Sequence, residues 1–165
     1  IKMATSFLKV YNAFLSRITA DEWTLEEDIE IVKRDWRQLL DIAIFRFKYP
    51  RVSLETKKVD PNPEDEYDGL VECGCFEEDL TADEIQLLAL YMKHEWIKRC
   101  IASWENIRQL YADKDFSQAN HLDKLNKLED AVRKEVREAE GIYDRSRGKR
   151  PSALFKKLAG KKNNV

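Results

Sequence analysis

The sequence predicts a mostly α protein, a bundle of four main helices with one inserted β-hairpin and an extended basic C-terminal tail. Only five Gly and four Pro occur among 165 residues, and 36% of the residues are charged. This composition favours long helices over an architecture of strands and turns. Apolar residues also recur at helical spacing along most of the chain. A chain of this length is expected to form one domain around one core.

The first two helices are predicted from caps and breakers. Ser6 can cap a first helix, because a hydroxyl oxygen accepts from the free N–H groups of the first turn. Thr24 with Glu27 has the spacing of a capping box. The second helix is therefore expected to run from about 25 to 48, and Pro50 ends it.

The third and fourth helices are longer. Thr81 with Glu84 forms another capping box, which begins a helix of about 30 residues, the expected spine of the core. The fourth helix has a narrow apolar stripe that ends at Tyr143. Such a stripe suits a helix that lies on one other helix or on a neighbouring copy. The helical domain is thus expected to span residues 1–143.

The segment from about 51 to 79 is predicted to be the inserted hairpin. Apolar and polar residues alternate from residue 52, and residues 70–76 form a second β-prone run. An isolated two-stranded hairpin is barely stable in water, so this one must pack on the helices or on a neighbouring subunit. The hairpin residues expected to make such contacts are Val52, Leu54, Leu70, Val71 and Phe76.

Charge is segregated toward the C-terminus. Residues 145–165 hold eight bases and no acid, whereas residues 1–144 hold 21 bases and 31 acids, so the two parts carry charges of +8 and −10. Segregation of this kind indicates contact with a partner. Residues 144–165 are expected to form the basic tail, with a short amphipathic segment at 152–159.

Several uses of the tail stay open from the residues alone. As a nucleic-acid arm, it would contact phosphates and make binding steeply salt-dependent. As a membrane anchor it is weak, because two helical turns carry too little apolar area. As a peptide that folds into a groove of an acidic protein, it would use Leu154, Phe155 and Leu158 as anchors, while its lysines steer. A solvated tail is the remaining reading.

No site in the sequence is expected to be catalytic. The common motifs for phosphates, dinucleotides and a serine nucleophile do not occur. Cys73, Cys75, Cys100, His94 and His121 are metal-ligand types, but they lack the paired spacing of a zinc site. His94 is instead expected on a polar helix face. We therefore expect no enzyme activity, no metal and no cofactor.

The apolar runs are shorter than the ~20 residues that a membrane-spanning helix needs, so no membrane partner is expected. An odd number of cysteines without a secretory signal favours reduced thiols and a cytosolic compartment.

Three stretches of the chain resemble a known family. They are residues 5–19 (TSFLKVYNAFLSRIT), residues 43–51 (AIFRFKYPR), and residues 80–92 (LTADEIQLLALYM) together with 117–122 (SQANHL). The chain is similar here to the small helical neck proteins of tailed bacteriophages, the head-to-tail connector or adaptor proteins. The resemblance covers residues 4 to about 143 and rests on packing and capping motifs.

This resemblance implies a structural virion protein. Such a protein forms a ring of about twelve copies beneath the portal protein, joins the portal to further neck or tail proteins, and lets packaged DNA pass through its lumen. It is assembled in the host cytoplasm and lies at the head-tail interface of the virion. The hairpin residues would then contact other subunits or the next ring.

In ring adaptors of this kind, an extended C-terminal segment reaches a neighbouring ring. The residues thereby assigned to portal docking are Arg147, Lys149, Arg150, Leu154, Phe155, Lys156 and Leu158. A nucleic-acid-binding regulatory or packaging protein, which would use the same basic tail on phosphates, is the alternative function.

Overall fold

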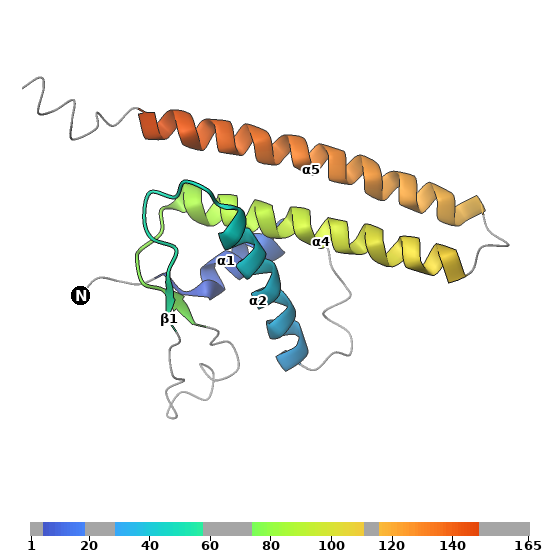
Figure 1. The fold of residues 1–165 in the computed structure, drawn as a ribbon, viewed down its shortest axis with the longest axis horizontal. Helices are drawn as coiled ribbons and strands as arrows, with labels where there is room; N and C mark the ends of the chain where they lie inside the picture. Colours follow the sequence, from blue (N-terminus) through green and yellow to red (C-terminus); the bar gives the residue numbers. More distant parts are fainter. Residues whose placement is uncertain (1–4, 19–28, 58–73, 111–115, 149–165) are drawn as a thin grey trace, which may run out of the picture.

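The fold was analysed in a computed structural model that describes residues 5–18, 29–57, 74–110 and 116–148. Figure 1 shows the elements in chain order. They are α1 (Phe7–Leu15), α2 (Ile29–Arg46), β1 (Thr56–Lys57), β2 (Cys75–Phe76), α4 (Ala82–Leu110) and α5 (Phe116–Gly148). The prediction of a mostly helical protein with four helices and an inserted hairpin is confirmed.

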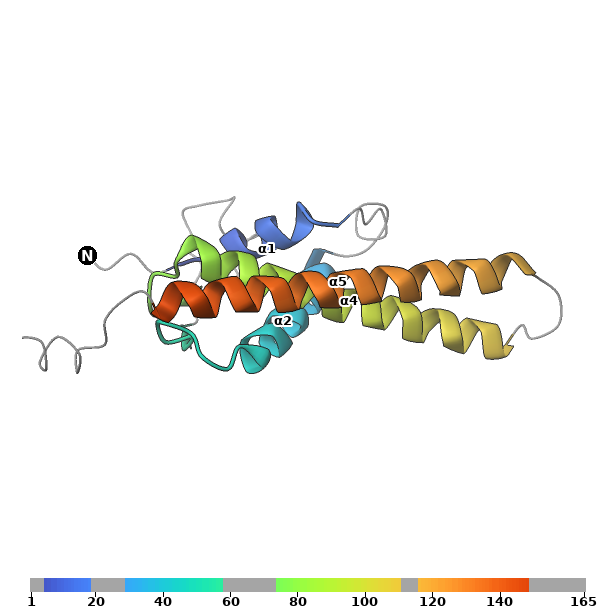
Figure 2. The same cartoon turned by 90° about the horizontal axis from the view of Figure 1, so that it is seen from above.

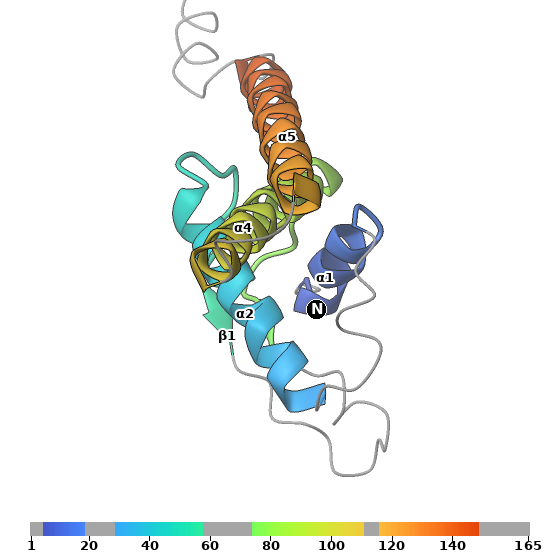
Figure 3. The ribbon, with the colours of Figure 1, turned by 90° about the vertical axis from the view of Figure 1, so that its right-hand side faces the viewer.

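The helices are arranged around α4. The helix α5 runs back along α4, and α1 and α2 both pack on the first half of α4 (Figures 1 and 3). Seen from above, α1 and the C-terminal part of α2 lie on opposite sides of the α4–α5 pair (Figure 2). The helix α4, the third along the chain, is therefore the spine of the core, as its sequence pattern predicts.

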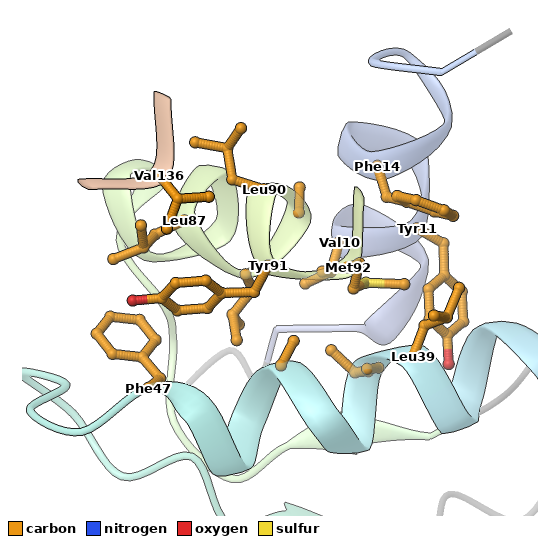
Figure 4. Close-up of a cluster of buried hydrophobic side chains, with 14 of the residues drawn as sticks. Val10, Tyr11, Phe14, Leu39, Phe47, Leu87, Leu90, Tyr91, Met92 and Val136 are labelled. Atoms are coloured by element: carbon orange, nitrogen blue, oxygen red, sulfur yellow. The ribbon is translucent and has the colours of Figure 1, made fainter. Parts of the chain in front are cut away.

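Aromatic and aliphatic side chains from all four helices form one core (Figure 4). The Phe47 ring lies edge-on to Tyr91 of α4 and to Tyr143 of α5, with centroid distances of 5.9 and 5.3 Å. Such edge-to-face pairs contribute about 0.5–1.5 kcal/mol beyond area burial. Among the largest side chains with almost no exposure are Phe7, Tyr11, Phe14, Leu39, Leu88, Met92 and Ile97.

The two described caps agree with the sequence pattern. The Ser6 hydroxyl accepts from the Leu8 N–H at 3.2 Å. The capping box of α4 is reciprocal: Thr81 N–H donates to the Glu84 carboxylate at 2.9 Å, and Glu84 N–H donates to the Thr81 hydroxyl at 3.3 Å. The other predicted box, Thr24 with Glu27, lies outside the described residues.

The hairpin strands are shorter than the sequence pattern predicts. Thr56 pairs with Phe76, and Lys57 pairs with Cys75, in one antiparallel ladder. The N-terminal segment hydrogen-bonds to the other edge of β2, where the Phe76 N–H donates to the Thr5 carbonyl at 2.8 Å. The strand β2 therefore fastens the start of α1 to the hairpin.

The fourth helix, α5, continues beyond the apolar stripe that ends at Tyr143. It runs through Gly148. The Ser146 hydroxyl donates to the Tyr143 carbonyl at 2.7 Å and accepts from the guanidinium of Arg51. These bonds fasten the last turns of α5 to the body, so the predicted boundary at residue 143 falls inside a helix.

The prediction that His94 lies on a polar helix face is wrong. His94 is only 3% exposed and joins three helices. Its Nδ1 lies 2.6 Å from the guanidinium of Arg46 on α2, and its Nε2 lies 2.6 Å from the carboxylate of Glu129 on α5. A guanidinium can only donate, so Nδ1 accepts and Nε2 carries the proton that Glu129 receives.

Gly74 holds the turn into β2 in a conformation that other residues rarely adopt. Its φ is +110°, and a Cβ placed there would lie 2.8 Å from the Lys57 carbonyl oxygen and 2.9 Å from the Phe7 ring. We expect Gly74→Ala to lower the free energy of unfolding by about 1–3 kcal/mol, because it adds both backbone strain and a clash. Chemical denaturation followed by circular dichroism measures the change.

A matched control is Gly141→Ala in α5. An added Cβ at Gly141 meets only the guanidinium of Arg145, at 3.9 Å. Alanine is favoured over glycine inside a helix, so this variant should be more stable by about 0.5–1 kcal/mol. Equal effects of the two variants would show that the Gly74 turn is not strained.

Candidate interaction surface

The residues that the sequence assigned to portal docking fall around and beyond the end of α5. Arg147 belongs to the last turn of that helix. The other six, Lys149, Arg150, Leu154, Phe155, Lys156 and Leu158, lie outside the described residues. Their role in docking stays a prediction.

The hairpin residues assigned to subunit contacts divide into three groups. Val52 and Leu54 are half-buried and pack against the core of their own chain, before β1 begins. Phe76 is completely buried, with its ring 4.9 Å from that of Phe7. Phe76 therefore has no exposed surface to offer to a second copy, which corrects its assignment. Leu70 and Val71 are not among the described residues.

The structure reveals exposed apolar side chains, of which the sequence pattern had placed only Leu128 on a predicted apolar stripe. Phe45 on α2 is 92% exposed and Ile142 on α5 is 61% exposed. Tyr49, which follows α2, is 65% exposed, and Ile31, Leu128 and Ile42 are 46%, 43% and 38% exposed. The signal for Phe45 was present in the sequence, since it falls outside the buried stripe that includes Leu39, Ala43 and Phe47. An exposed aromatic on a helix is typical of a contact surface.

A buried carboxylate, that of Glu84, bonds to several segments at the end of the molecule where α5 ends. Glu84 is fully buried. Its Oε1 accepts from the Arg51 N–H and from the Tyr143 hydroxyl, both at 2.8 Å, while its Oε2 accepts from Thr81. The carboxylate thus joins the start of α4 to the segment after α2 and to the last turns of α5.

These hydrogen bonds decide the ionisation of the cluster. Burial alone would raise the pKa of Glu84, but the hydrogen bonds from Thr81, Tyr143 and Arg51 outweigh burial, and the pKa lies below its usual value. Burial and the bond to Glu84 raise the pKa of Tyr143 to about 12. At neutral pH a charged carboxylate therefore faces a neutral phenol that donates to it.

A cavity of about 360 Å³ lies beside this cluster, between the end of α2, the first turns of α4 and the last turns of α5. The Tyr91 hydroxyl donates to Glu140 at 2.8 Å, and the Arg46 guanidinium lies 4.8 Å from the centre of the Tyr91 ring. Burial and the bond to Glu140 raise the pKa of Tyr91. Three polar side chains that line the cavity, those of Tyr91, Glu140 and Arg46, thus interact with one another. The cavity is lined by Arg46, Phe47, Lys48, Tyr49, Leu87, Tyr91, Glu140, Tyr143 and Asp144.

Comparison with family models, curated proteins and solved structures finds no match to this chain. In the ranges that the structure describes, no cluster of three His, Cys, Asp or Glu side chains could hold a metal ion. None of the helices within these ranges has the length and apolar character to cross a membrane. Cys75 and Cys100 are both half-buried and form no disulfide with one another.

We predict that Glu84→Gln lowers the free energy of unfolding by about 1.5–3 kcal/mol at pH 7, because a neutral amide replaces a charged acceptor of several hydrogen bonds. The folded-state pKa is lowered, so this stabilisation is present above the unfolded pKa of about 4.3 and is lost as the pH falls. The difference between wild type and variant should therefore shrink below about pH 4.3. Urea denaturation at a series of pH values measures it.

The exposed Glu138 of α5 supplies a matched control. Glu138→Gln should change stability by less than about 0.5 kcal/mol at any pH, because its carboxylate is solvated. Tyr143→Phe removes one donor to Glu84 and should fall between the two variants. A pH-independent deficit for Glu84→Gln would contradict the role given to the charge.

Proposed function

We propose that this chain is a structural virion protein of a tailed bacteriophage, a head-to-tail connector or adaptor. In this proposal about twelve copies form a ring under the portal protein and join it to further neck or tail proteins. Packaged DNA passes through the lumen of the ring. The protein acts by contact and not by turnover, and it is assembled in the host cytoplasm before it takes its place at the head-tail interface.

The observation that carries the proposal is the exposed apolar surface on a helical body. Phe45, which is 92% exposed, and Ile142, which is 61% exposed, lie on helices whose opposite faces pack in the core. Aromatic side chains of this kind are the usual anchors of protein interfaces. They support a protein that works by binding other protein chains.

Parts of all three stretches that carry the family resemblance lie close together in the fold, whereas residues 117–122 lie at the start of α5, where His121 stacks on Trp104. Phe47, from the second stretch, packs on Tyr91, from the third. The hydroxyl of Thr5, at the start of the first stretch, accepts from the Leu80 N–H at 2.9 Å. The larger part of the resemblance therefore concerns residues that pack together around the first half of α4, which supports the proposal.

The tail supplies the proposed link to the portal. It leaves α5 after Gly148, next to the cluster of Glu84, Arg51 and Tyr143, so its starting point is held firmly. Portal docking is assigned to Arg147, Lys149, Arg150, Leu154, Phe155, Lys156 and Leu158. The competing function, a nucleic-acid-binding regulatory or packaging protein, uses the same positive charges on phosphates.

Light scattering of the chain mixed with the portal of the same phage tests the proposal. We expect the full-length chain to join the portal in a ring stoichiometry and a chain ending at Gly148 to fail. This truncation retains all of α5, so loss of binding reports on the tail and not on the helix.

Two matched tail variants distinguish the apolar contribution to portal binding from the contribution of the positive charges. A triple substitution of Leu154, Phe155 and Leu158 by alanine keeps all eight positive charges and should abolish portal binding. Substitution of Lys149, Arg150 and Lys156 by glutamine should mainly slow association. If the full-length chain ignores the portal but retards DNA, with a salt slope near −0.9 per phosphate contacted, the connector proposal is wrong and the nucleic-acid function replaces it.

A further inference from the structure

The cavity between the end of α2, the first turns of α4 and the last turns of α5 has an apolar floor. Four of its lining residues, Phe47, Leu87, Tyr91 and Tyr143, are each no more than 6% exposed. Figure 4 shows Phe47, Leu87 and Tyr91 grouped together. The cavity volume of about 360 Å³ is within the range of binding pockets, about 300–1,000 Å³. The cavity can therefore take an apolar or aromatic side chain.

The side of the cavity formed by α5 is acidic. Glu140 and Asp144 both line it. Glu140 accepts from the neutral Tyr91 hydroxyl at 2.8 Å, and within the described ranges no base pairs with either carboxylate. Besides burial, the bond to Glu140 and the charges of Glu140 and Asp144 raise the pKa of Tyr91. Both negative charges are therefore available to a basic ligand.

The side formed by the end of α2 has two bases, but one of them is already engaged. The Arg46 guanidinium bonds to His94 and lies 3.8 Å from the Glu95 carboxylate. Lys48 is the other base, and it is exposed. The two carboxylates of α5 thus outnumber the one lysine that remains, which favours an occupant with positive charge next to its apolar group.

The basic tail has this chemistry. Leu154, Phe155 and Leu158 are its apolar residues with helical spacing, and Lys156 and Lys157 stand between them. No acid occurs after Asp144. The tail therefore combines an aromatic anchor with adjacent positive charges, as the floor and the acidic side of the cavity require.

The tail also begins close enough to reach the cavity. Asp144 and Glu140 precede Gly148 by four and eight residues, which is about 6 and 12 Å along a helix. Phe155 follows Gly148 by seven residues, which can span up to about 23 Å of extended chain. Even with a reversal of direction after Gly148, Phe155 can return to the cavity.

We propose that the tail docks in this cavity of its own chain, with Phe155 on the apolar floor and Lys156 and Lys157 near the carboxylates of Glu140 and Asp144. In this closed form, the apolar anchors that were assigned to portal docking are covered. The portal must then displace them from the cavity before it can bind them. This regulatory role rests on the proposed function, whereas the contact itself does not.

The same chain is favoured over a second copy because the tail is attached beside the cavity. Six residues separate Gly148 from Phe155. A short linker holds two sites at an effective concentration on the order of millimolar. The tail of a second copy at micromolar concentration would compete poorly with it, so closure is expected in the single chain.

Proteolysis of the full-length chain by chymotrypsin, which cleaves after aromatic residues, tests the contact. Asp144→Lys reverses an exposed charge at the cavity and leaves the tail sequence unchanged. Cleavage after Phe155 should be about three- to tenfold faster in this variant, because an attraction becomes a repulsion and the open form is more populated. Thermal unfolding should match wild type, since Asp144 is exposed.

Glu138→Lys is the matched control. Glu138 is exposed on α5 and does not line the cavity, so the same charge reversal there should leave the cleavage rate at the wild-type value. Equal rates for wild type and Asp144→Lys would overturn the proposal. Equal acceleration by both reversals would overturn it as well, because the effect would then come from the overall charge of the body.

Nuclear magnetic resonance locates the tail. Joint substitution of Leu154 and Phe155 by alanine should shift the amide signals of Leu87 and Tyr91 and leave that of Trp104, in the second half of α4, unchanged. The shifts should be the same at every protein concentration. Shifts that grow with concentration would place the tail of a second copy in the cavity, and an absence of shifts would show an empty cavity. Each of these two results overturns the proposal.

The portal separates failure of the contact from failure of the connector function. If closure delays docking, Asp144→Lys should join the portal faster than wild type and Glu138→Lys should not. If the cavity signals respond to the tail but no chain joins the portal, the contact stands and the portal function is wrong. If the chains join the portal but the cavity signals ignore the tail, the function stands and the contact is wrong.

Discussion

The buried carboxylate of Glu84 is the contact on which the placement of the other elements depends. A buried charge is tolerated only when hydrogen bonds replace its water. Here the donors come from Thr81 at the start of α4, Arg51 after α2, and Tyr143 near the end of α5. Three segments are therefore held at one point, so the end of α5 and the chain after α2 are both bonded to the start of α4.

Local signals in the sequence predicted local structure well. The capping box at Thr81 and the 29-residue length of α4 follow from spacing along the chain alone. The same signals could not show that Glu84 also accepts from Arg51 and Tyr143, which lie 33 and 59 residues away. For the same reason the sequence pattern predicted a polar face for His94. In the structure His94 is buried, and Arg46 and Glu129 supply the hydrogen-bond partners of its two ring nitrogens.

The hairpin and the exposed residue Phe45 show what a sequence pattern reports about apolar residues. Alternation at Val52 and Leu54 reflects packing against the core and not strand pairing, because β-propensity reports a half-buried surface. A helical stripe identifies the face of α2 that is buried in its own chain. It assigns no role to an apolar residue such as Phe45, which is exposed on the opposite face.

In the proposed function, the docking segment begins where several parts of the body are bonded together. The last turns of α5 lie at the end of the molecule where Glu84 accepts from Tyr143. The Ser146 hydroxyl adds a second bond there, because it accepts from the Arg51 guanidinium. A junction held by these bonds would give the segment after Gly148 the same starting point in every copy that binds the portal.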